Sequence, residues 1–168
     1  MKTILERCKT LVENNNNEGG TLSYVRDTEV IHPDIAMTRI SITSLPKIVF
    51  TPISTSESWI ASQRKQQLHR LASYLILQYH QRESSIMGDS SRPAGHGKGI
   101  MDFVADFMTV FRGHRFASGG TNYLDKPMDV VSIEYFKPEM SEEPQLLVAE
   151  IVMECSRLIL QDSLPGNV

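Results

Sequence analysis

The sequence is poor in cysteine and has no long apolar run. Cys8 and Cys155 are its two cysteines, too few for the disulfide framework that stabilises many small secreted domains. No apolar stretch reaches the length of about 18 residues that a membrane-spanning helix needs. Charged residues are scattered through the first 14 positions, and they interrupt the apolar segment that a secretory signal requires. These absences predict a soluble intracellular protein, cytoplasmic or nuclear.

Sequence signatures of catalytic and metal sites are missing as well. The chain has no Cys-x-x-Cys pair and no Gly-x-Ser-x-Gly segment, which mark many zinc sites and serine hydrolases. Five histidines are present, but none forms a close ligand pair with another. We therefore predict no metal ion, no cofactor and no catalytic residue, and we favour a protein without enzymatic activity over an enzyme.

What the sequence does have is the size and composition of one globular domain. Its 168 residues are 40% hydrophobic and 22% charged, enough to build one apolar core. The first apolar residues follow helical spacing: Ile4, Leu5, Cys8, Leu11 and Val12. An Asn- and Gly-rich stretch comes directly after them. We predict an N-terminal arm over 1–20, made of a short helix and a flexible linker, and a single α+β domain over 21–168.

The predicted strands mostly precede the predicted helices. Strands are predicted over 21–26, 29–32, 36–43, 47–50 and 129–136. Helices are predicted over 54–82, over 100–111, and from about 141 to the Pro165-Gly166 pair. Because strands and helices do not alternate regularly, a doubly wound parallel fold is disfavoured. We predict an α+β fold in which an antiparallel sheet of about four strands carries three main helices on one face, with a short N-terminal helix in addition.

The two longest helices, over 54–82 and from about 141, are predicted from the spacing of their apolar residues. Ser54-Thr55-Ser56-Glu57 has the form of a capping box, and apolar residues then recur at 68, 71, 72, 75, 76 and 79. The last helix is predicted from a wide apolar face: Leu147, Val148, Ile151, Val152, Cys155, Leu158 and Ile159. The helix over 100–111 has only Asp102, Asp106 and Thr109 on its polar side, so we expect it to be largely buried.

Charge is unevenly divided along the chain, although the formal net charge is only −3. Residues 58–98 hold six basic residues against two acidic ones, whereas residues 127–168 hold eight acidic residues against two basic ones. The two segments either neutralise each other within the fold or form opposite faces that pair between subunits. We favour neutralisation within the fold.

A glycine-rich segment before the helix over 100–111 is the most distinctive local feature. Gly97 and Gly99 surround Lys98, and His96 precedes them. Backbone amides at a helix N-terminus attract anions, and a lysine beside them can hold a phosphate. The P-loop signature fails, however, because Lys98 is followed by glycine rather than by serine or threonine. We favour the alternative that this segment is a flexible linker.

Two further groups of basic residues are candidates for binding an anion or nucleic acid. Arg64, Lys65 and Arg70 lie in a stretch that contains no acidic residue, and phosphate binding needs a basic surface more than a motif. Arg112 and Arg115 follow the predicted buried helix, where cations also stabilise the helix dipole. For both groups we favour a structural or solvent-exposed role over ligand binding.

These patterns lead to three hypotheses of function. The first is a non-enzymatic structural, adaptor or regulatory interaction protein that self-associates into a homo-oligomer or binds a protein partner. The second is binding to nucleic acid or to an anionic membrane surface, a role that would also suit a viral assembly or host-interaction protein. The third is a small phosphate-ester or nucleotide-dependent enzyme that uses Lys98 with Asp102 and Asp106.

Overall fold

The computed structural model of the chain describes residues 1–31, 44–61, 64–78, 83–89, 97–118, 121–136 and 146–160. Its helices are α1 (Lys2–Asn15), α2 (Ser84–Met87) and α3 (Ile100–Phe111). Its strands are β1 (Asp27–Val30), β2 (Lys47–Ala61), β3 (Arg64–Gln78), β4 (Ala117–Ser118), β5 (Thr121–Asn122), β6 (Lys126–Phe136) and β7 (Leu146–Leu160). None of the helices in these ranges is long and apolar enough to cross a membrane.

Five of the strands form one mixed sheet in the order β1-β2-β3-β7-β6. The β1–β2 pair is parallel, and the other three pairs are antiparallel. Strands β4 and β5 form a separate short hairpin. The sheet therefore has β7, the last strand among the described residues, in its interior, between β3 and β6.

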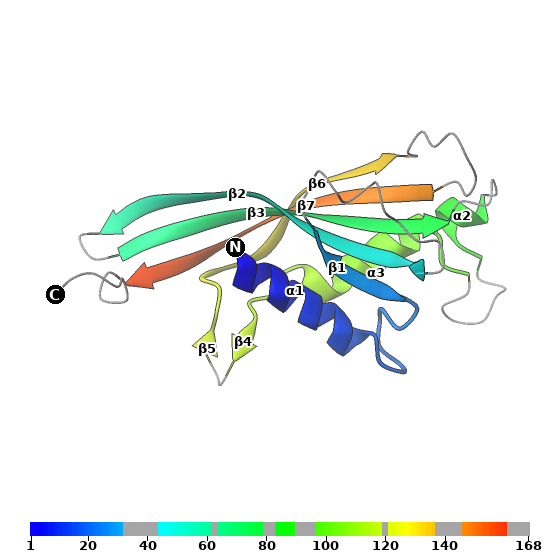
Figure 1. The fold of residues 1–168 in the computed structure, drawn as a ribbon, viewed down its shortest axis with the longest axis horizontal. Helices are drawn as coiled ribbons and strands as arrows, with labels where there is room; N and C mark the ends of the chain where they lie inside the picture. Colours follow the sequence, from blue (N-terminus) through cyan, green and yellow to red (C-terminus); the bar gives the residue numbers. More distant parts are fainter. Residues whose placement is uncertain are drawn as a thin grey trace.

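Helices α1 and α3 pack on the same face of the sheet (Figure 1). Their apolar sides meet the central strands in one core, at whose centre three phenylalanine rings lie together. Phe107 stacks on Phe111 with ring centroids 4.2 Å apart, and Phe50 of β2 lies 5.7 Å from Phe111. The four-residue spacing on α3 places these rings on one side of the helix, and that side faces the sheet.

One end of the sheet extends past both helices as a three-stranded projection (Figure 1, left). We call this projection the β-arm; it consists of residues 53–61 of β2, 64–70 of β3 and 154–160 of β7, and at its base His69, Cys155 and Ser156 are still buried. Strand β2 is buried from Lys47 to Thr51, and it is exposed from Ile53 to its end. The helices thus cover only about the first third of β2, and they leave the rest outside the core.

The predicted α+β fold with three main helices on an antiparallel sheet is wrong. The predicted helix over 54–82 is instead β2 and β3, and the predicted last helix is β7. The sheet has five strands and includes a parallel pair. Only α1 and α3 are long helices within the described residues.

The error has a physical cause. At one end of the sheet β3 and β7 are covered on both faces, and a second apolar cluster lies opposite the main core: Leu45, Val49, Ile76, Leu146 and Val148. A strand buried on both faces shows a continuous apolar run instead of alternation, and such a run also fits helical spacing. The Ser- and Thr-rich start of the supposed helix, read as a capping box, is an exposed strand instead.

Other predicted elements are confirmed. The helix over 100–111 has the predicted bounds and is largely buried, and the N-terminal helix is present as α1. The predicted strand over 47–50 is the start of β2, and the predicted strand over 129–136 lies in β6.

The predicted strand over 21–26 is wrong. This segment forms turns instead, in which the amides of Ser23 and Val25 donate to carbonyls three residues earlier. The predicted strand over 36–43 lies outside the described residues.

Candidate functional site

The β-arm carries a row of paired side chains on the face that continues the helix-covered side of the sheet. Register places Thr55 opposite His69, Glu57 opposite Gln67, and Trp59 opposite Lys65. The Lys65 ammonium lies 3.4 Å from a Glu57 carboxylate oxygen and 4.6 Å from the centre of the Trp59 ring. A hydrogen bond from Gln67 and the nearby Lys65 hold the pKa of Glu57 below its ordinary value. This row is therefore ordered and close to neutral.

His69 lies at the base of the β-arm, where this row of side chains meets the buried core. Its side chain is buried, and its Nδ1 lies 3.1 Å from the Thr55 hydroxyl. Burial lowers the pKa of His69, because the cationic ring would lose its hydration. The neutral ring is consequently the favoured form at neutral pH, and His69 adds no charge to the arm.

Exposed apolar side chains gather along β2 in the β-arm. Ile53, Trp59 and Ile60 are 49%, 57% and 55% exposed, and Leu158 of β7 is also exposed. Single exposed apolar residues are ordinary, but a group on one projecting element is typical of an interaction surface. Tryptophan in particular is enriched among the residues that dominate binding energy at protein interfaces.

The opposite face of the sheet carries charged pairs that link its strands. Glu154 of β7 lies between Arg70 of β3, at 2.9 Å, and Lys126 of β6, at 3.4 Å. The hydrogen bond from Arg70 comes first among the interactions that lower the pKa of Glu154. Tyr74 donates a hydrogen bond to Glu150, and burial together with this bond raises the pKa of Tyr74 to about 12. The basic and acidic segments of the sequence therefore meet on adjacent strands.

Three of the predicted anion-binding residues lie on β3 rather than on a helix. Arg64 is exposed at the end of the β-arm, opposite Ala61. Lys65 is paired with Glu57, and Arg70 is paired with Glu154. Of these three, Arg64 is the cation for which no ion pair with a described carboxylate is found. His96 lies outside the described residues.

Lys98 belongs to a small polar cluster at the start of α3. Its ammonium lies 2.8 Å from Asp106, which also accepts a hydrogen bond from the Tyr24 hydroxyl at 2.9 Å. Burial, with the hydrogen bond to Asp106, raises the pKa of Tyr24 well above its ordinary value. Asp102 accepts a hydrogen bond from the Gly99 amide and so caps the helix. Lys98, Asp102 and Asp106 are thus occupied with one another and with their neighbours.

Arg112 and Arg115 lie at the other end of α3. Arg112 ends the helix and is exposed. Arg115 donates a hydrogen bond to the backbone carbonyl of Asp125 at 2.8 Å, so it joins the chain after α3 to the start of β6. The predicted cations are therefore distributed over the β-arm and over both ends of α3, and they form no single cluster.

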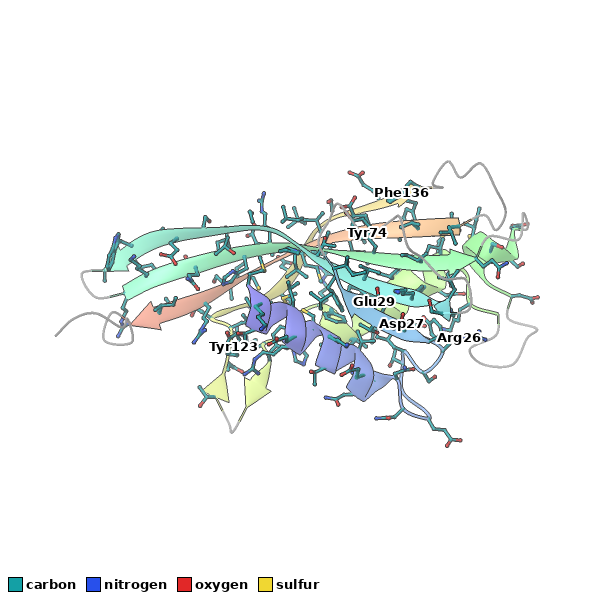
Figure 2. All side chains as sticks on the ribbon, in the orientation of Figure 1. Arg26, Asp27, Glu29, Tyr74, Tyr123 and Phe136 are labelled. Carbon is teal, nitrogen blue, oxygen red and sulfur yellow. The ribbon has the colours of Figure 1, made fainter. Side chains whose placement is uncertain are left out.

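A second arrangement of basic residues was not predicted from the sequence. The guanidinium groups of Arg7 and Arg157 lie 4.2 Å and 4.5 Å from the centre of the Tyr123 ring, and Arg157 also donates a hydrogen bond to the Tyr123 hydroxyl. Figure 2 shows Tyr123 beside α1, on the side of the sheet that the helices cover. These residues are far apart in the sequence, so no local spacing signals their contact. The cation–π contacts fasten α1 and β7 to the segment between β5 and β6.

Lys47 is a further buried cation that the sequence did not reveal. Its side chain is 4% exposed, and its ammonium lies 2.9 Å from Asp27 and 2.8 Å from Glu29 on β1 (Figure 2 labels both acids). Burial alone would lower the pKa of Lys47, but the hydrogen bonds to Glu29 and Asp27 outweigh it and raise the pKa above its ordinary value. The parallel register of β1 on β2 brings the three groups together, and their role is structural.

Neither a metal-binding arrangement nor a similarity to known proteins assigns a function to these sites. Among the described residues, no group of three or more histidine, cysteine or acidic side chains is arranged to hold a metal ion. The sequence matches no protein-family model and no curated protein. The exposed β-arm is consequently the strongest candidate for a functional surface, and it is defined by geometry alone.

Proposed function

We propose that this chain is a non-enzymatic structural, adaptor or regulatory interaction protein that self-associates through its β-arm. The observation that carries the proposal is the projection of β2, β3 and β7 beyond the helices, with Trp59 and Ile60 more than half exposed on it. Apolar side chains held on a rigid strand lose little conformational entropy when a partner covers them. A projecting sheet of this kind is suited to pairing with another surface.

The proposal also fits the charges of the arm. Lys65 with Glu57, and Arg70 with Glu154, are ion pairs within the chain, so a second copy can approach without strong repulsion between like charges. We further propose an intracellular location, because Cys8 and Cys155 are both buried free thiols, as expected in a reducing compartment.

The test is sedimentation velocity of the purified chain over a wide range of protein concentrations, at low and at high salt. We expect a concentration-dependent shift to a larger species that persists in salt, because apolar contacts are not screened. Ile60→Ser in the β-arm should weaken this shift. Val131→Ser, which changes a residue of similar exposure on β6, should leave it unchanged. A chain that stays monomeric at every concentration contradicts the proposal.

Binding of nucleic acid or an anionic membrane is a second candidate. Arg64 and Arg112 are exposed cations that support it. The ion pairs of Lys65, Arg70 and Lys98 count against it, because a bound phosphate would have to compete with a carboxylate already in place. Arg64→Glu should abolish a salt-sensitive gel shift or vesicle pull-down if this candidate is right.

A nucleotide-dependent enzyme is the third candidate and ranks last. It would need Lys98, Asp102 and Asp106 to leave the contacts they make with each other, with Tyr24 and with Gly99. A thermal-shift screen with nucleotides and Mg²⁺ tests this directly. A rise in melting temperature that Lys98→Ala removes would favour the enzyme over an interaction protein.

A further inference from the structure

Among the residues that the structure describes, no strand pairs with the outer edge of β2 along the β-arm. Strand β1 pairs with β2 only as far as Phe50, whose carbonyl accepts the last hydrogen bond of that pair from the amide of Ile31. Beyond this point, no strand of the described residues lies on the side of β2 that faces away from β3. Outward-facing amides and carbonyls of an edge strand form a ready template for another strand.

The open edge contains one regular stretch of strand between two irregularities. The register of β2 on β3 shifts between Pro52 and Ser54 and again between Trp59 and Ala61. Between these bulges, every residue from Ser54 to Trp59 has a single partner on β3. This stretch is therefore the part of the edge that can form a regular ladder with a further strand.

We propose that two copies of the chain pair along this stretch, antiparallel and related by a two-fold axis through Ser56, and this inference rests on the function proposed above. The occupant of the open edge is thus a second copy of the same strand. The pairing would join two five-stranded sheets into one continuous sheet. The ladder would end at Ser54, before the bulge at Ile53 and the part of the edge that β1 covers.

The position of the axis follows from the side chains. In a continuous sheet, residues directly opposite each other point to the same face. Since side chains alternate between the two faces, each residue must pair with one that is an even number of positions away. One residue therefore lies opposite its own copy, and the two-fold axis passes midway between these two. An axis through Glu57 would place the two Glu57 carboxylates directly opposite each other, and like charges there are destabilising. An axis through Thr55 would bring Pro52 into the ladder, where it lacks an amide to donate.

An axis through Ser56 avoids both problems and makes the strand complementary to itself. It places Thr55 opposite Glu57 of the second copy and Ser54 opposite Ser58, and it brings Trp59 to the bulge at Ile53 of the second copy. The exposed Trp59 and Ile53 of opposite copies then lie near each other at both ends of the ladder, and no charge lies directly opposite another. Each Glu57 keeps its own Lys65 at 3.4 Å, so the interface is neutral. This self-complementarity favours a second copy over an unrelated protein.

Single cysteine variants test the register on the full chain. Only a residue on the axis meets its own copy, at a Cα separation of about 4.5–5.5 Å, which lies within the range that a disulfide spans. We expect Ser56→Cys to form a disulfide-linked dimer under mild oxidation at least tenfold faster than Ser54→Cys or Ser58→Cys. The last two should crosslink only when mixed, because Ser54 faces Ser58 of the other copy.

The controls separate the register from the proposed function. The wild-type chain contains buried Cys8 and Cys155, so it reports any background crosslinking. If the wild-type chain self-associates in sedimentation but Ser54→Cys or Ser58→Cys alone crosslinks as fast as Ser56→Cys, the register is wrong and the proposed function stands. If the wild-type chain remains a monomer and Ser56→Cys does not crosslink, both are wrong. Rapid crosslinking of Ser56→Cys alone, together with that of the mixture, supports the inference.

Discussion

Replacement of Trp59 by serine is the most direct test of the β-arm as an association surface. The ring is 57% exposed and lies over the Lys65 ammonium at 4.6 Å. A tryptophan presents up to about 250 Å² of surface, so about 140 Å² of this one faces solvent. If a partner covers about half of that area, burial at ~25 cal/mol per Å² contributes nearly 2 kcal/mol per copy.

A symmetric dimer buries two such rings, so Trp59→Ser should weaken association by about 3.5 kcal/mol, or roughly 300-fold in Kd. Sedimentation equilibrium over a wide concentration range measures that change. The melting temperature at low protein concentration should hardly move, because substitutions at exposed positions usually have small effects on stability. Tyr135→Ser on β6 removes an aromatic ring of similar exposure outside the β-arm, and it is the matched control. A Kd within threefold of the wild-type value for Trp59→Ser would refute the reasoning.

Four other predictions concern stability and reactivity. Phe107→Ala removes a fully buried ring that stacks on Phe111, so it should lower the free energy of unfolding by about 3–5 kcal/mol in urea titrations. Lys47→Ala leaves two carboxylates of β1 without their buried cation and should cost about 3 kcal/mol in the same titrations. The pKa of Lys47 is raised in the folded chain, so its contribution to the free energy of unfolding is fully present below the ordinary lysine pKa. That contribution is lost as pH rises through the raised pKa. Melting temperatures of the wild-type chain from pH 8 to pH 11 measure the loss. Burial raises the pKa of the Cys8 and Cys155 thiols, and a thiol reacts through its deprotonated form. A thiol reagent at pH 8 should therefore label neither cysteine in the native chain and both cysteines in urea. Rapid labelling of the native chain would contradict their burial.

The sequence predicted those elements whose pattern has only one interpretation. Helix α3 combines phenylalanines at a spacing of four with glycines before and after it, and this pattern fits no strand. Helix α1 has a one-sided apolar spacing followed by an Asn- and Gly-rich stretch. In both cases local residues specify the element, and packing against the sheet does not overrule them.

The two long strands could not be predicted in this way. In β3, Leu75, Ile76 and Leu77 are all buried, because the main core covers one face and the smaller cluster covers the other. The sequence then carries no alternation, and the choice between helix and strand depends on neighbours far along the chain. Strand β7 contains β-branched residues, which favour strands, but its apolar residues also fit the helical spacing on which the prediction was based.

The candidate surface escaped prediction for a related reason. Ser54 to Glu57 resembles a helix cap in sequence, whereas its exposure depends on the tertiary fold, in which β1 pairs with β2 only as far as Phe50. The contact of Arg7 and Arg157 with Tyr123 likewise joins three distant parts of the chain. Charge counting favoured a meeting of the basic and acidic segments within the fold over pairing between subunits, and Arg70 with Glu154 is one ion pair between them.

The interior position of β7 has a consequence for synthesis of the protein. While the chain is being made, β3 and β6 emerge before the strand that separates them in the sheet. Until Leu146–Leu160 arrives, both strands expose bare edges, and the α1–α3 core lacks the residues that β7 contributes. Sheets completed by such distant pairings form slowly and are prone to aggregation before completion. Folding on the ribosome should therefore finish only after almost the whole sequence described here has been translated.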